Sequence, residues 1–110
     1  MQVLEQHQSP DRLLRFIVVR HDDADTSLGF DGFPWHTHAD IIAFEGESEE
    51  QGVRRFVGDL LCGRSIISVA RIGERIRDVW IAENAVPDQY KPANEVIEFR
   101  RWDGASVPQR

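Results

Sequence analysis

The chain has 110 residues, of which 41% are hydrophobic and 29% are charged, and its formal net charge is −6. This length and composition predict one soluble globular domain spanning residues 1–110, and they exclude a disordered chain. The single cysteine, Cys62, excludes an internal disulfide and a zinc site built from several cysteines.

No stretch is apolar for long enough to cross a membrane, and the polar N-terminus lacks the basic start and apolar run of a secretory signal. We therefore expect a cytoplasmic protein with no membrane partner. A surface that binds duplex DNA or RNA needs clustered lysines and arginines, whereas Lys91 is the one lysine and the arginines are scattered. Nucleic acid is thus not an expected partner, and the acidic balance suits a basic protein or a small ligand better.

The first half of the chain predicts two strands. Residues 1–11 are polar and predict a flexible, loosely held lead-in. In Leu13–Arg20, successive Phe, Ile and Val residues favour a buried strand. Residues 21–27 are small and acidic, which is typical of a loop. Trp35–Phe44 predicts a second strand, with a short helix from about Thr37 as the alternative.

An amphipathic helix is predicted over residues 49–62. Ser48 and Gln51 have the spacing of a capping box, and Gly63 is a natural stop. One apolar stripe runs along this segment at helical spacing, formed by Val53, Phe56, Val57, Leu60 and Leu61. Such a stripe must pack on another element, and strands are the elements available.

The second half of the chain predicts three more strands. Ser65–Arg71 and Arg75–Ala82 flank a short loop that contains glycine, as in a β-hairpin. Residues 84–94 contain two prolines and predict a longer connection to a last strand at Glu95–Trp102. Residues 105–110 are expected to be a flexible tail.

These elements give the order β-β-α-β-β-β. The fold class is therefore predicted to be α+β, with one main helix packed on a mostly antiparallel, twisted sheet of about five strands. Strand order is left open by the sequence.

The most unusual chemistry is in the segment 29–44, where His36, His38 and Asp40 occupy every second position. On a strand the two histidines face the same side, with Cα atoms about 6.6 Å apart, and two imidazoles at that spacing can bind a divalent transition metal. Asp40 would be a third ligand or a base, although a straight strand would hold it about 13 Å from His36. The alternative is structural: each ring bonds a carbonyl or carboxylate, Asp40 orients His38, and no cofactor is bound.

A second candidate site is a rim of aromatic and basic side chains for a ligand or a protein partner. Its members are Phe30, Phe33, Trp35, Arg100 and Trp102. A glycine-rich turn that carries two phenylalanines can leave them exposed as a contact surface. The alternative is that these aromatics fill the core.

Three classes of function remain open, and no residue is assigned a catalytic role, so an enzyme is not the favoured class. The first is a non-catalytic protein-interaction module that neutralises or regulates a basic partner, as small acidic bacterial domains sometimes do. The second is a metal-dependent small enzyme or metal-binding protein that uses His36, His38 and Asp40. The third is a homodimer that binds a small ligand near its tryptophans.

Overall fold

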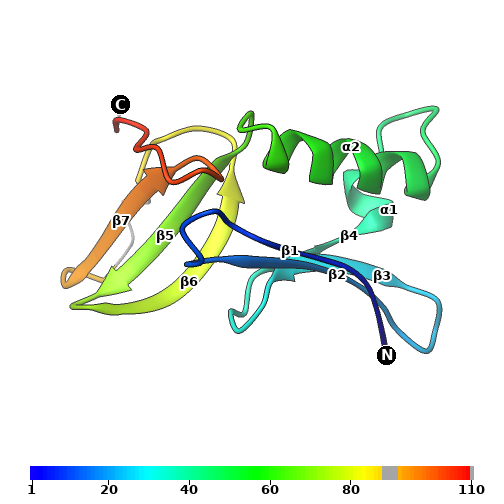
Figure 1. The fold of residues 1–110 in the computed structure, drawn as a ribbon, viewed down its shortest axis with the longest axis horizontal. Coiled ribbons are helices and arrows are strands. Elements are labelled where there is room, and N and C mark those ends of the chain that lie inside the picture. Colours follow the sequence, from blue (N-terminus) through cyan, green and yellow to red (C-terminus); the bar gives the residue numbers. More distant parts are fainter. Residues whose placement is uncertain (88–91, 110) are drawn as a thin grey trace.

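Two antiparallel sheets and two helices make up the fold, and the computed structural model describes residues 1–87 and 92–109 (Figure 1). The first sheet has the strand order β1-β2-β3-β4, formed by Gln2–Gln8, Arg15–Arg20, Thr26–Phe30 and His36–His38. The second has the order β6-β5-β7, formed by Arg75–Ala82, Ile66–Ile72 and Glu95–Arg100. The helices α1 (Ala39–Ile42) and α2 (Glu49–Leu61) connect the two sheets.

The α+β class is confirmed, and so is the main helix. α2 begins after Ser48, whose hydroxyl accepts a hydrogen bond from the Gln51 N–H at 3.1 Å, while the Gln51 side chain accepts from the Ser48 N–H at 2.9 Å. The predicted hairpin is present as β5 and β6, and the last strand is present as β7. No helix in the described part of the chain is long and apolar enough to cross a membrane.

The prediction of one five-stranded sheet with a single helix was wrong in its details. Gln2–Gln8, which we expected to be a loose lead-in, forms β1 and pairs with β2. Thr26–Phe30 is an additional strand, β3. The predicted strand at Trp35–Phe44 is divided, because the chain turns into α1 directly after His38. Residues 88–91 of the predicted 84–94 connection, and Arg110 of the predicted tail, lie outside the described residues.

One hydrophobic core is shared by both sheets and α2. Phe16 of β2 is central to it: its ring lies 5.1 Å from the Phe30 ring in an edge-on arrangement and 6.2 Å from the Phe56 ring of α2. The buried members of this core come from β2, β3, α1, α2, β5 and β6, together with Leu14 before β2 and Trp102 after β7. The core therefore fixes α2 against the first sheet while it joins that sheet to the second.

Polar contacts also connect the two sheets. The Arg100 guanidinium of β7 donates to the Asp11 carboxylate at 2.6 Å and to the carbonyl of Trp102 at 3.0 Å. The Trp35 N–H donates to the Asp78 carboxylate of β6 at 3.1 Å. The Arg100 hydrogen bond, more than any other contact, holds the pKa of Asp11 well below its usual value, against the opposing effect of burial.

We predict that Asp11→Asn lowers the free energy of unfolding by about 1–2 kcal/mol at neutral pH, a modest loss because Asp11 is partly exposed to solvent. A depressed folded-state pKa stabilises the protein above the unfolded-state value of about 4, and this contribution is lost as the pH falls toward the folded-state value. In urea denaturation, the gap between wild type and variant should be constant above about pH 5 and narrow below it. Asp31→Asn is the control, because its contact with Arg15 is long, at 3.8 Å, and exposed. A gap that widens in acid would contradict this assignment.

Two glycines of α2 provide a second, matched prediction. A Cβ on Gly58 would meet nothing within 4 Å, so Gly58→Ala should stabilise the protein by about 0.5–1 kcal/mol through helix propensity alone. A Cβ on Gly52 would lie 3.0 Å from the Ala43 Cα, so Gly52→Ala should destabilise it by about 1–2 kcal/mol. Thermal unfolding of both variants checks the packing of α2 against the end of α1, and equal stabilisation by both substitutions would show that this contact is loose.

Candidate functional site

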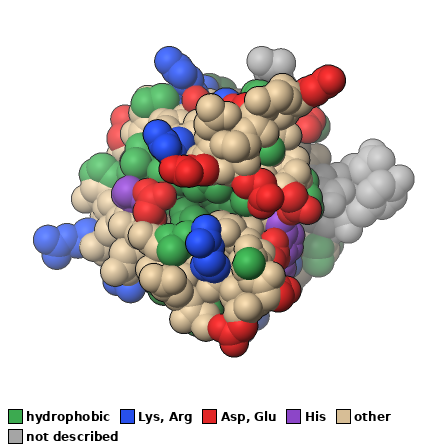
Figure 2. All heavy atoms as spheres, turned by 90° about the vertical axis from the view of Figure 1, so that its right-hand side faces the viewer, with side chains coloured by type: hydrophobic (Ala, Val, Ile, Leu, Met, Phe, Trp, Pro, Cys, Tyr) green, Lys and Arg blue, Asp and Glu red, His purple; other side chains and the backbone are tan. Residues whose placement is uncertain are grey.

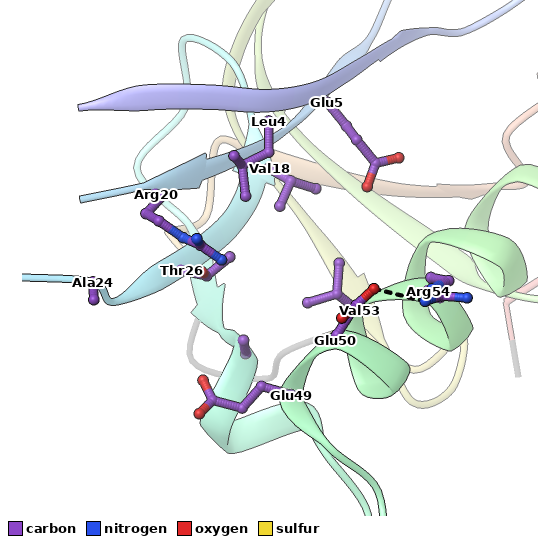
Figure 3. A pocket seen from close by; sticks show the side chains of 11 residues that line it. Leu4, Glu5, Val18, Arg20, Ala24, Thr26, Glu49, Glu50, Val53 and Arg54 are labelled. Atoms are coloured by element: carbon purple, nitrogen blue, oxygen red, sulfur yellow. Dashed lines mark hydrogen bonds and ion pairs between the residues drawn. The ribbon is translucent and has the colours of Figure 1, made fainter. Parts of the chain in front are cut away.

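A groove of about 640 Å³ lies between the first sheet and the N-terminal half of α2 (Figure 3). Its apolar surface comes from Leu4 of β1, Val18 of β2, Ala39 of α1 and Val53 of α2. The remaining residues around it are Glu5, Arg20, Ala24, Thr26, Glu49, Glu50 and Arg54. The groove therefore has an apolar floor with charged groups at its margins, which is the usual composition of a binding site.

The strand β1 forms one wall of the groove through an irregularity in its pairing. The register with β2 shifts between Val3 and Glu5, which places a bulge at Leu4. Leu4 and Glu5 therefore both line the groove, although neighbours on a regular strand face opposite sides. The Leu4 side chain stays 40% exposed, so part of the floor is open to a ligand.

The charged groups of the groove differ in how well they are paired. Glu50 and Arg54 form an ion pair at 2.6 Å on α2, drawn as a dashed line in Figure 3. Glu5 contacts His7 at 3.1 Å. Within the described ranges, neither Arg20 on β2 nor Glu49 at the start of α2 has a hydrogen-bonding or ion-pair partner. These two side chains are available to a bound molecule.

The groove opens at the acidic end of the molecule. Residues 21–53 hold nine carboxylates and no lysine or arginine; the carboxylates are Asp22, Asp23, Asp25, Asp31, Asp40, Glu45, Glu47, Glu49 and Glu50. Of these, Asp31 lies at the other end of β3, beside Arg15. In Figure 2, which looks at the end with the β2–β3 turn and the start of α2, hydrophobic side chains lie in a hollow bordered by charged ones. This charge segregation was readable in the sequence, but we did not use it to predict a site.

The acidic loop before α2 is held in place by one arginine. Arg55 donates to the Glu47 carboxylate at 3.0 Å and to the Ile42 carbonyl at 2.6 Å, and its guanidinium lies 3.6 Å from the centre of the exposed Phe44 ring. The hydrogen bond from Arg55 is the main reason that the pKa of Glu47 is lowered. The loop that carries the chain from α1 into the groove wall is therefore anchored to α2 itself.

The histidine stretch lies at the edge of the first sheet. The rings of His36 and His38 are neighbours, with centroids 5.0 Å apart. Nδ1 of His36 lies 3.1 Å from the Pro34 carbonyl oxygen, and Nδ1 of His38 lies 2.8 Å from the Asp25 carboxylate. The carboxylate on His38 is thus Asp25 of the β2–β3 turn, whereas we had proposed Asp40 for that role.

The structure does not bring His36, His38 and Asp40 together. Asp40 lies in the first turn of α1, where the chain has left the strand. Among the described residues, no three His, Cys, Asp or Glu side chains are grouped closely enough to hold a metal ion. A metal held by the two imidazoles would therefore need ligands from water or another molecule.

The residues of the predicted aromatic rim do not form one exposed surface, although Phe30 and Trp35 are neighbours with ring centroids 6.3 Å apart. Phe30 and Trp102 are core residues, 2% and 6% exposed. Phe33 and Trp35 are partly buried against the same core. Arg100 is buried and bonded to Asp11. Of these residues, Phe30, Phe33 and Trp35 line a small hollow of about 130 Å³ on the outer side of the first sheet, together with His36.

Comparisons with protein-family models, curated proteins and solved structures find no match for this chain.

The two neighbouring histidines should differ in their structural importance. His38→Ala removes a half-buried ring and its Asp25 partner, so we expect a loss of about 1 kcal/mol in the free energy of unfolding. His36→Ala removes an exposed ring with one backbone contact, and we expect a change within about 0.5 kcal/mol. Thermal melts with and without added zinc measure both effects. A zinc-induced rise in melting temperature that His36→Ala abolishes would instead favour the metal-binding alternative.

Proposed function

We propose that this chain is a non-catalytic protein-interaction module that holds a basic segment of its partner in the groove between β1 and α2. The observation that carries this proposal is the composition of the groove. An apolar floor of Leu4, Val18 and Val53 lies beside the carboxylates of Glu5 and Glu49.

A lysine or arginine side chain suits both parts of such a site. Its methylene stem can cover the apolar floor while its charged end reaches the carboxylates at the margin. Glu49 has no partner within the described ranges, so this carboxylate is available for an incoming cation. The nine carboxylates of residues 21–53 and the net charge of −6 add long-range attraction for a basic partner.

Arg20 would set the direction in which the bound segment of the partner lies in the groove. Its guanidinium lies in the same groove, at the end formed by β2 and the β2–β3 turn (Figure 3). A free guanidinium donates hydrogen bonds to a carboxylate or a backbone carbonyl of the partner. A basic side chain near Glu49 and an acceptor near Arg20 would then fix the direction of the bound segment.

Titration with a lysine homopeptide tests this proposal, followed by NMR of the backbone amides and the methyl groups. We expect shifts at Leu4, Val18 and Val53, and an affinity that falls as salt is added. Glu49→Lys should weaken binding by about fivefold or more, since one exposed charge pair contributes up to about 1 kcal/mol and the reversal adds repulsion.

Two controls make this experiment decisive. Glu74→Lys makes the same charge change in the β5–β6 turn of the second sheet, away from the groove, and should leave the peptide affinity nearly unchanged. A glutamate homopeptide should not produce the same shifts. Equal weakening by both lysine variants would mean that net charge alone attracts the peptide, and the groove would then lose its assigned role.

A further inference from the structure

The free edge of the first sheet is a second interaction surface, and it adjoins the groove at Leu4 and Glu5 of β1. β1 is the outer strand of that sheet, and six of its seven residues are exposed. An edge strand presents a row of backbone N–H and C=O groups that have no partner within the sheet. Such a row can pair with another strand.

The other sheet edges in the described part of the chain are shorter or are contacted by other segments. β7 is covered by the C-terminal segment, where the Val107 N–H donates to the Phe99 carbonyl at 2.9 Å and Ser106 bridges Arg100. β4 has three residues. β6 lies beside the β3–β4 connection, where Asp78 accepts the Trp35 N–H. β1 is the long edge that remains open.

The backbone groups of β1 that point outward follow from the alternation of an antiparallel ladder. The Ser9 N–H donates to the Leu14 carbonyl at 2.8 Å, so this pair is hydrogen-bonded. His7 opposite Phe16 and Glu5 opposite Val18 continue the same register at every second position. The N–H and C=O groups of Gln6 and Gln8 therefore point away from β2.

We propose that a second copy of this chain pairs with β1 in antiparallel orientation, across a two-fold axis at Gln6. In this arrangement Gln6 exchanges two backbone hydrogen bonds with its symmetry mate, and the two four-stranded sheets join into one. The inference goes beyond the proposed function and does not depend on it.

The pairing of a carboxylate with an imidazole selects this register. Pairing about Gln6 places Glu5 of each copy opposite His7 of the other, on the face that carries the grooves. Residues directly opposite each other on one face interact, and an imidazole N–H can donate a hydrogen bond to a carboxylate there. Pairing about Glu5 or His7 would instead place identical side chains opposite each other.

The dimer should be weak and reversible. The bulge at Leu4 restricts regular pairing to the end of β1 that follows it. The two backbone hydrogen bonds at Gln6 and two exposed contacts between Glu5 and His7 give an interface at the small end of the range for protein complexes. Both grooves would open on the same face of the joined sheet, on either side of the axis.

Sedimentation equilibrium of the full chain over a wide concentration range tests this proposal. All variants are made in a Cys62→Ser background, because the exposed Cys62 thiol could otherwise form an intermolecular disulfide. We expect a monomer–dimer equilibrium, and we expect Gln6→Pro to abolish it by removing an outward N–H that β2 does not use. Gln6→Val keeps the N–H and should keep the dimer. Circular dichroism melts confirm that both variants are folded.

A charge-reversal cycle tests the register. Glu5→Lys and His7→Glu should each raise the dimer dissociation constant by about tenfold, since each affects two symmetry-related pairs. The double variant restores unlike charges across the axis and should return the constant to near its original value. Amide hydrogen exchange at Gln6 should slow as protein concentration rises. A protein that stays monomeric at all concentrations, or a dimer insensitive to Gln6→Pro, would overturn the proposal.

Discussion

The fold depends on the packing of α2 into a core that both sheets share. Val53, Val57 and Leu60 lie along one side of this helix and are buried, and they contact a core that includes β2, β3, β5 and β6. The two sheets have no strand in common, so hydrophobic burial supplies most of the free energy that keeps them together. The contacts of Arg100 with Asp11 and of Trp35 with Asp78 then add directional restraints at the periphery.

This packing also creates the groove. α2 packs against the first sheet where its Phe56 ring lies 6.2 Å from the Phe16 ring, and the first turns of α2 border a hollow beside Leu4. The capping box fixes where the helix begins, and Arg55 ties the preceding loop to the helix. The charged side chains at the groove margin therefore sit on anchored backbone, so a ligand would meet a largely preformed site.

The sequence predicted a helix or strand correctly where the spacing of its apolar residues matches the side chains that are buried in the structure. The helix was predictable because its cap and its apolar stripe agree, and the β5–β6 hairpin was predictable because Ile and Val residues flank a glycine turn. β1 could not be found in this way, since an exposed strand held by backbone pairing has no hydrophobic period. The division into two sheets depends on which strands pair, which is a long-range property that local patterns do not encode.

The candidate sites show the same limit. Strand spacing correctly placed His36 and His38 side by side, but the sequence left open whether a strand or a short helix from about Thr37 follows. The structure has the helix, which begins at Ala39 and carries Asp40 away from the strand. The groove brings together residues from β1, β2, α1 and α2, which no single motif connects.

The contact between Asp11 and Arg100, which are far apart in sequence, also affects the order in which the chain can assemble during synthesis. This contact can close only after β7 has been synthesised, whereas each strand of the first sheet pairs with its neighbour in sequence. The strands of the first sheet can therefore pair early in translation, while the joint with β7 forms later.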